Sequence, residues 1–353
     1  MNLRTPKTPF LKGMAALDWL GSITIVGSVV MFLLGLEFGG VTKPWTSTTV
    51  LCLIIFGLFT GILFFLIEWR IARYPIMPLG LFRSLPNTIA LLATFFDGIV
   101  FTAATFYLPL YFQSVLGATP LLSGVWFMPF AISVAMCSSA TGIYIEKTGR
   151  YAECIVFGFF FVTLGFGLFI DLPTNRQWAK IVLFQIIAGI GIGPNFQGPL
   201  VALQTNVPPQ ENATATATFN FIRNIASSIA VVIGSVLFSN SLRNQRSKLA
   251  SVSPQLAELL TTGDAQANVF AIDKLPDQVR AVGRSAIALS LRKDWIMFTA
   301  LAAVGLVIST FFRPQVLSET RKSVPLGLET EEAKYVANKE RFNRCRGEKV
   351  TKV

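Results

Sequence analysis

Two ionisable side chains lie inside long apolar runs of the sequence. Asp97 is the tenth residue of the run 88–112, and Arg223 is the seventh residue of the run 217–238. In helices these positions lie about 15 Å and about 10 Å from the start of each run. A charge at the centre of a membrane helix costs about 2.5–3.5 kcal/mol, so it needs a polar cavity or a partner. We expect Asp97 to line such a cavity and to contact a substrate or a proton, with a hydrogen bond to a neighbouring helix as the alternative.

Arg223 has two main options. It can line the same cavity as a second charge, or its long stem can carry the guanidinium to the membrane surface. A direct ion pair with Asp97 is a third and less expected arrangement.

The run 181–203 is interrupted by helix-breaking and polar residues. They are two glycines four residues apart, two prolines and two carboxamides: Gly189, Gly193, Pro194, Pro199, Asn195 and Gln197. The glycines allow close helix packing, and the prolines remove backbone hydrogen bonds and bend the helix. Broken spans with polar groups near the midplane are where transporters bind their substrates, and tight packing alone is the alternative. Pro129 adds another bend, and Tyr107 adds a polar group at the end of its span.

A short charged stretch, Gly-Ile-Tyr-Ile-Glu-Lys-Thr-Gly-Arg over 142–150, separates two apolar runs. Its position predicts a turn at a membrane surface. Gly149 gives the turn its freedom, Lys147 and Arg150 suit an anionic lipid surface, and Glu146 is expected near the start of the following helix, whose positive end it would complement.

The composition indicates a polytopic membrane protein. The chain has 353 residues, of which 52% are hydrophobic and 14% are charged. Soluble domains carry roughly 25% charged residues. There is no histidine, which removes His-based metal sites and every Ser/His or Cys/His dyad. The four cysteines form no close pair in sequence and are expected to pack as small apolar groups. We therefore expect no metal, no cofactor and no enzymatic activity.

Eight apolar runs are long enough to cross a membrane as helices. They cover residues 17–36, 48–69, 88–112, 121–145, 151–170, 181–203, 217–238 and 295–312. Lys and Arg alternate between the short loops and place both termini and the 142–150 turn in the cytoplasm. The same rule explains the net charge of +11 better than nucleic-acid binding does. Residues 239–294 are expected as an external loop with a short surface-lying helix at 276–293, and the sequon at Asn212 is expected to be internal and unused.

The 142–150 stretch fits Gly-x-x-x-Asp-Arg/Lys-x-Gly-Arg, the cytoplasmic signature of the major facilitator superfamily. Gly142, Lys147, Gly149 and Arg150 match it, and Glu146 replaces the Asp. Residues 15–40, 107–124 and 204–223 resemble the fungal fourteen-helix drug:proton antiporters, and the resemblance covers about residues 3–312. In that family six more helices come first, with a first signature loop and a Gly/Pro antiporter motif that have no counterpart in this sequence. The chain therefore resembles the latter part of a transporter and is compatible with a shortened gene.

The resemblance implies an all-α membrane protein that contains the C-terminal six-helix bundle of a major facilitator fold and two preceding helices. We divide it into a cytoplasmic basic tail (1–16), two linker helices with a cytoplasmic loop (17–86), the six-helix bundle with external loop 239–294 (87–313) and a disordered cytoplasmic tail (314–353).

The implied activity is proton-coupled export of an amphipathic drug, toxin or other secondary metabolite by rocking of two bundles. Glu146 and Arg150 would lock the cytoplasmic ends, Asp97 and Arg223 would be cavity charges, and the polar lining would be Tyr107, Asn195 and Gln197. Ala226 and Ala230 stand where glycine is expected, which puts tight packing of that helix in doubt.

The implied partners are the lipid bilayer, the substrate, protons, and either a second copy of the chain or a missing amino-terminal half. The expected location is the plasma membrane, with the vacuolar membrane as the alternative. The alternative function is a truncated, non-transporting fragment of such a pump. A membrane enzyme is disfavoured, because the spans hold neither paired carboxylates nor a nucleophile motif.

Overall fold

The computed structural model of the chain describes residues 18–39, 42–70, 77, 79–208, 211–261, 272 and 275–312. Within these residues the secondary structure is helical, and the one β-bridge joins Gly39 and Lys43, which confirms the predicted all-α class. The helices are α2 (Trp19–Phe38), α3 (Thr48–Arg70), the 3₁₀ helix η1 (Leu79–Arg83), α4 (Leu85–Ser114), α5 (Pro120–Thr148), α6 (Ala152–Phe169), α7 (Trp178–Thr205), α8 (Asn212–Arg243), α9 (Arg246–Val252), α10 (Pro254–Thr261) and α12 (Asp277–Ser309). The predicted tails 1–16 and 314–353 lie outside the described residues.

Seven of the described helices, α2 to α8, are long and apolar enough to cross a membrane. The eighth predicted span, 295–312, forms the second part of α12. The last eighteen residues of α12 still include Arg292, Lys293 and Asp294, so α12 carries more charged residues than any of these seven helices.

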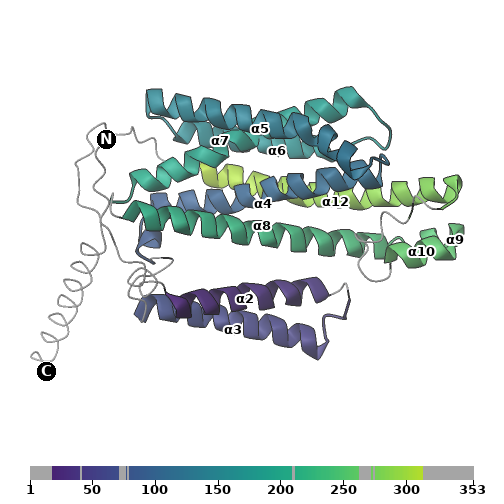
Figure 1. Cartoon of the computed structure of the whole chain (residues 1–353), viewed down its shortest axis with the longest axis horizontal. Helices are drawn as coiled ribbons and strands as arrows, with labels where there is room; N and C mark the ends of the chain where they lie inside the picture. Colours follow the sequence, from purple (N-terminus) through teal and green to yellow (C-terminus); the bar gives the residue numbers. More distant parts are fainter. Residues whose placement is uncertain are drawn as a thin grey trace, which may run out of the picture.

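Six long helices form one bundle. α7 packs against both α5 and α6, α4 packs against α8 and α12, and α12 also packs against α6. In Figure 1, α5, α6 and α7 lie on one side of α4, α12 and α8, and the α2–α3 hairpin lies on the other side. This hairpin touches the bundle through α2 and α8.

Small residues bring neighbouring helices close together. Gly189 and Gly193 lie against α5, where a methyl group on Gly193 would be only 2.7 Å from the Cβ of Cys137. Gly191 lies against α6, because a methyl group there would be 2.7 Å from the carbonyl carbon of Phe161. α7 continues as one helix through both Pro194 and Pro199. The glycines and prolines of the interrupted run therefore lie within a continuous helix of the bundle.

The segment predicted as external loop 239–294 is largely helical. α8 continues to Arg243, α9 and α10 follow, and α12 begins at Asp277. The predicted surface-lying helix at 276–293 is wrong in one respect, because these residues are the first half of a continuous helix of 33 residues. Part of its apolar face is covered by packing, as at Gly283, where an added methyl group would be 3.1 Å from Leu256 of α10, whereas Leu289 is exposed.

Candidate functional site

Asp97 and Arg223 form a direct ion pair between α4 and α8. The Nη2 atom of Arg223 lies 3.1 Å from Oδ2 of Asp97, and the two side chains are 15% and 1% exposed. The arrangement that the sequence favoured least is therefore the one observed. Arg223 does not extend to the membrane surface, and Asp97 has a charged partner instead of an open cavity.

The pair belongs to a regular interface. Along the same side of α4, Thr102 donates a hydrogen bond to Ser227 at 2.8 Å, and Tyr107 donates one to the carbonyl of Val231 at 3.0 Å. The three contacts join residues 124–126 positions apart, so α4 and α8 run parallel in a constant register. The backbone register thus sets the position of the ion pair.

Glycine on α4 allows the two helices to approach at this level. A methyl group on Gly98 would lie 3.0 Å from the Cβ of Ala226 and 3.2 Å from the carbonyl oxygen of Arg223. Ala226, which stands where the family resemblance predicted glycine, is fully buried. Close packing is therefore kept, because the small residue is supplied by α4.

An aromatic pair from α4 and α7 surrounds the guanidinium of Arg223. Its Cζ lies 3.5 Å from the ring centroid of Phe196 and 5.7 Å from that of Phe101. The two rings meet edge to face at 4.9 Å. Cation–π contacts of desolvated guanidinium groups contribute about 2 kcal/mol, so three helices hold Arg223 in place. Phe196 was not among the site residues predicted from the sequence, although it lies between Asn195 and Gln197 in the interrupted run.

Asp97 keeps one free acceptor. Its Oδ1 atom is buried and has no hydrogen-bond partner among the described residues. A carboxylate with one oxygen paired and one oxygen free can bind a proton on the free oxygen. Protonation of this oxygen would remove the charge that pairs with Arg223.

The other residues predicted to line a polar cavity do not meet at this pair. Asn195 is fully buried, donates to the carbonyl of Gly191 at 3.3 Å, and lies against Gly158 of α6. Gln197 is exposed and lies three residues beyond Pro194, on another face of α7 than Phe196. Tyr107 is fully buried, and its hydroxyl donates a hydrogen bond to the carbonyl of Val231. Of the residues predicted for the substrate or proton pathway, the structure thus joins only Asp97 and Arg223 directly among the described residues.

The charged turn is shorter than predicted. α5 continues to Thr148, and Gly149 ends it in the left-handed region with φ of 69°, where glycine is favoured. Glu146 therefore lies in the last turn of α5 and not near the start of the next helix, which corrects the sequence prediction. Lys147 shares that last turn, and Gly142, also in α5, has no described atom within 4 Å of where its Cβ would be.

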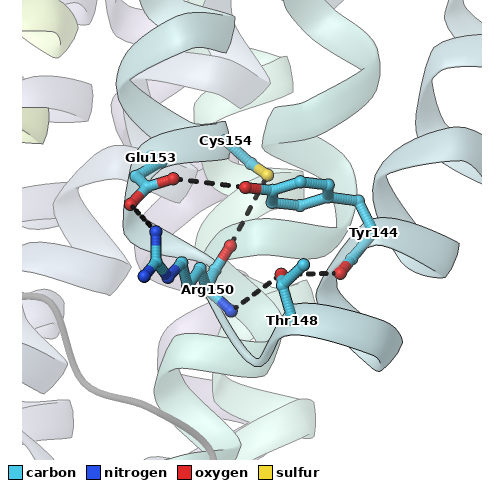
Figure 2. A network of polar contacts seen from close by, with 5 residues as sticks. All are labelled: Tyr144, Thr148, Arg150, Glu153 and Cys154. Carbon is cyan, nitrogen blue, oxygen red and sulfur yellow. Dashed lines mark hydrogen bonds and ion pairs between the residues drawn. The ribbon is translucent and has the colours of Figure 1, made fainter.

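Arg150 pairs with an acidic residue that was not among those predicted from the sequence. Its Nη1 atom lies 3.3 Å from Oε1 of Glu153, and Tyr144 donates its hydroxyl proton to the other carboxylate oxygen at 3.2 Å. Figure 2 shows this network across the turn between α5 and α6. Glu153 lies in the first turn of α6, where a negative charge is favoured. This position at the start of a helix is the feature of the sequence that could have identified Glu153.

A groove of about 490 Å³ opens beside this turn. Tyr144 of α5 and Glu153 and Phe157 of α6 form its sides, and Ile190 and Pro194 of α7 also line it. Because Phe196 lies on a different side of α7, the groove is separate from the Asp97 pair.

A sequence model of the Major Facilitator Superfamily matches residues 12–231. The chain belongs to the major facilitator superfamily. This finding confirms the resemblance drawn from the 142–150 turn, and it makes the chain an integral, multi-pass membrane protein.

The curated relatives are fungal transporters. The chain is 49% identical over 331 residues to efflux pump dotC of Dothistroma septosporum, which covers 94% of this chain and 56% of dotC. It is 45% identical over 354 residues to MFS-type transporter ppz2 of Metarhizium majus, covering 100% of this chain and 61% of ppz2. Efflux pump FUS6 of Gibberella fujikuroi is 30% identical over 324 residues. These names indicate transport, and the chain spans between half and two thirds of the length of these relatives.

Proposed function

We propose that this superfamily member takes part in proton-coupled export of an amphipathic organic molecule, such as a drug, toxin or other secondary metabolite. The observation that carries the proposal is the buried Asp97–Arg223 pair, because an ion pair inside membrane-spanning helices is expensive and is kept where it has a function. The names of the relatives, which include efflux pumps, support the direction of transport.

The proposed step is a proton exchange at Asp97. When a proton binds the free Oδ1, the carboxylate becomes a neutral acid and loses its attraction for the guanidinium. Arg223 is then a buried cation held by Phe196 and Phe101, which is a costly state. The bundle relieves this cost by changing the α4–α8–α7 contact, and release of the proton restores the pair. The same change of contact would alter access for the exported molecule.

The surrounding features take supporting roles in this proposal. The turn residues Gly142, Glu146, Lys147, Gly149 and Arg150 would form the conformational latch, with Glu153 fixing Arg150. The glycines and prolines of α7, together with Pro129, would shape the path, and Asn195 and Gln197 would act from its other faces. We place the protein in the plasma membrane with its termini in the cytoplasm, acting with a second bundle.

An export assay tests the proposal. The chain is expressed in yeast lacking its own pumps, and the loss of a preloaded fluorescent amphipathic dye is followed with and without a protonophore. We expect protonophore-sensitive loss for the wild-type chain and for Asp171→Asn, which changes an exposed ion pair. Cells that express the Asp97→Asn variant should not show this protonophore-sensitive loss of dye. If Asp97→Asn loses the dye at the wild-type rate, Asp97 has no role in the coupling step.

The second candidate is a membrane piece that does not transport by itself. It is favoured by the alignment, which covers 56–61% of dotC and ppz2. Dye loss equal to that of empty-vector cells, with the chain present in the membrane, would support this second candidate against independent export.

A further inference from the structure

The groove between α5 and α6 reaches from the charged turn into the membrane. On α5 its lining runs from Cys137 to Tyr144, about 10 Å along the helix. Cys154 and Phe157 of α6 form the other side, and α7, which packs against both helices, lines the rest. Because α5 and α6 are membrane-spanning helices of a multi-pass protein, the end of the groove at Tyr144 lies near a membrane surface and the end at Cys137 lies in the apolar layer.

The positions next to the groove on both helices are bulky, apolar and exposed. Met136, beside Cys137, is 67% exposed, and Phe160, one turn after Phe157, is 54% exposed. Surfaces that pack against another membrane helix are instead rich in small residues, as α7 is at Gly189, which lies against α5. The bulky positions beside the groove therefore favour lipid acyl chains, and not a further helix, as its cover.

A lysine lies just beyond the mouth of the groove. Lys147 follows Tyr144 by three residues on α5, so it lies about 5 Å further along the same side of the helix. It is exposed and takes part in none of the ion pairs among the described residues. Glu146 follows Tyr144 by two residues, about 200° around the helix, and so points away from the groove. The charge of Lys147 is therefore available at the mouth.

Arg150 adds a second cation at this end. It pairs through Nη1 with Glu153, which also lines the groove, and its side chain remains 61% exposed. A guanidinium has five N–H donors, so Arg150 can bind a second anion while it keeps Glu153. Figure 2 shows Arg150, Glu153 and Tyr144 gathered at the turn. Because Glu153 balances only one of the two cations, one positive charge remains beside the groove.

An apolar groove with a positive mouth matches the two parts of an anionic phospholipid. Basic pockets between membrane helices at a membrane surface bind anionic headgroups. We propose that an acyl chain of an anionic phospholipid lies in the groove between α5 and α6, and that the phosphate of this lipid contacts Lys147 and Arg150. The proposal does not depend on export, because it concerns the lipid that the chain binds at rest.

Photolabelling in vesicles tests the site. The full chain is reconstituted into phosphatidylcholine vesicles with a minor fraction of photoactivatable phosphatidylserine or phosphatidylcholine, each with a diazirine in the same acyl chain, and labelled peptides are located by mass spectrometry. Exposed apolar residues of α3, such as Ile55 and Ile62, report contact with bulk lipid. Relative to α3, phosphatidylserine should label the groove peptides of α5 and α6 several-fold more than phosphatidylcholine does.

Two variants test the two parts of the site separately. Lys147→Gln removes one exposed cation, so the preference for phosphatidylserine should fall by about fivefold. The matched control is Lys180→Gln at the exposed pair with Asp171, at the opposite end of α6, and it should keep the preference. Ala140→Trp places a ring in the groove, so both lipids should label the groove several-fold less while the label on α3 is unchanged.

Three results would overturn the proposal. Equal labelling of the groove by the two lipids, relative to α3, would mean that bulk lipid covers it without selection. An unchanged preference in Lys147→Gln would exclude the phosphate contact. If an amphipathic dye displaces the label from the groove but not from α3, the occupant is an amphipathic solute and not a lipid.

Discussion

Two regions of the bundle treat a buried carboxylate in different ways. On α4, Asp97 is 1% exposed and pairs with an arginine that is itself held by two aromatic rings. On α12, Asp294 is equally buried but has no partner among the described residues. The difference teaches that burial alone does not set the charge of an acid in a membrane bundle. Whether a buried acid has a counter-ion depends on the side chains of the helices packed against it.

The largest expected effect comes from removing the counter-ion of Asp97. Arg223→Met keeps the length of the side chain but leaves the carboxylate buried without compensation, so the free energy of unfolding should fall by about 3–5 kcal/mol. Denaturation of the purified chain by titration with a denaturing detergent measures this. The matched control is Arg150→Met at the exposed pair with Glu153, where the change should be less than about 1 kcal/mol. Equal changes for both variants would mean that Asp97 does not need its partner.

The same substitution at the two acids should sharpen the contrast. Asp97→Asn removes a charge-assisted hydrogen bond and should cost about 1.5–3 kcal/mol. Asp294→Asn changes a buried carboxyl group that has no hydrogen-bond partner among the described residues, so the free energy of unfolding should change by about 1 kcal/mol or less. Both are measured by the same denaturation. A larger loss at Asp294 than at Asp97 would show that Asp294 is ionised and has an essential partner.

The smallest expected effect is that of an exposed pair, Asp171 with Lys180. The hydrogen bond and the charge of Lys180, 2.8 Å away, hold the pKa of Asp171 below its ordinary value. This contribution to stability is present above the unfolded-state pKa of about 3.9 and is lost as the pH falls through the lower pKa of the folded chain. Thermal unfolding between pH 6 and pH 3 should therefore depend slightly less on pH in Lys180→Gln. An unchanged pH profile in that variant would mean that the pair does not contribute to the pH dependence of stability.

Most of the helices could be predicted from the apolar runs, because a chain in lipid must satisfy its backbone hydrogen bonds within each helix. The charges in the spans were also visible, since Asp97 and Arg223 interrupt otherwise apolar sequence. Their pairing was not, because it depends on the register between α4 and α8. That register is set by Gly98 and the hydrogen bonds at Thr102 and Tyr107, which no pattern within one run reveals.

Two misjudged positions have the same physical cause. Charged residues were read as the ends of helices, so Glu146 was placed in a turn and Asp294 outside its span. Both helices continue through these charges, α5 to Thr148 and α12 from Asp277. A helix ends where its backbone changes direction, as at Gly149 with its positive φ, and not where its side chains become polar.

The lengths of the connections distribute mechanical freedom unevenly in this bundle. Residues 149–151 are all that joins α5 to α6, and both helices are packed on α7. α8 and α12, in contrast, are separated by residues 244–276. The short connection therefore limits how far the neighbouring ends of α5 and α6 can separate, whereas the longer connection sets no such limit on α8 and α12, which are held together by their packing.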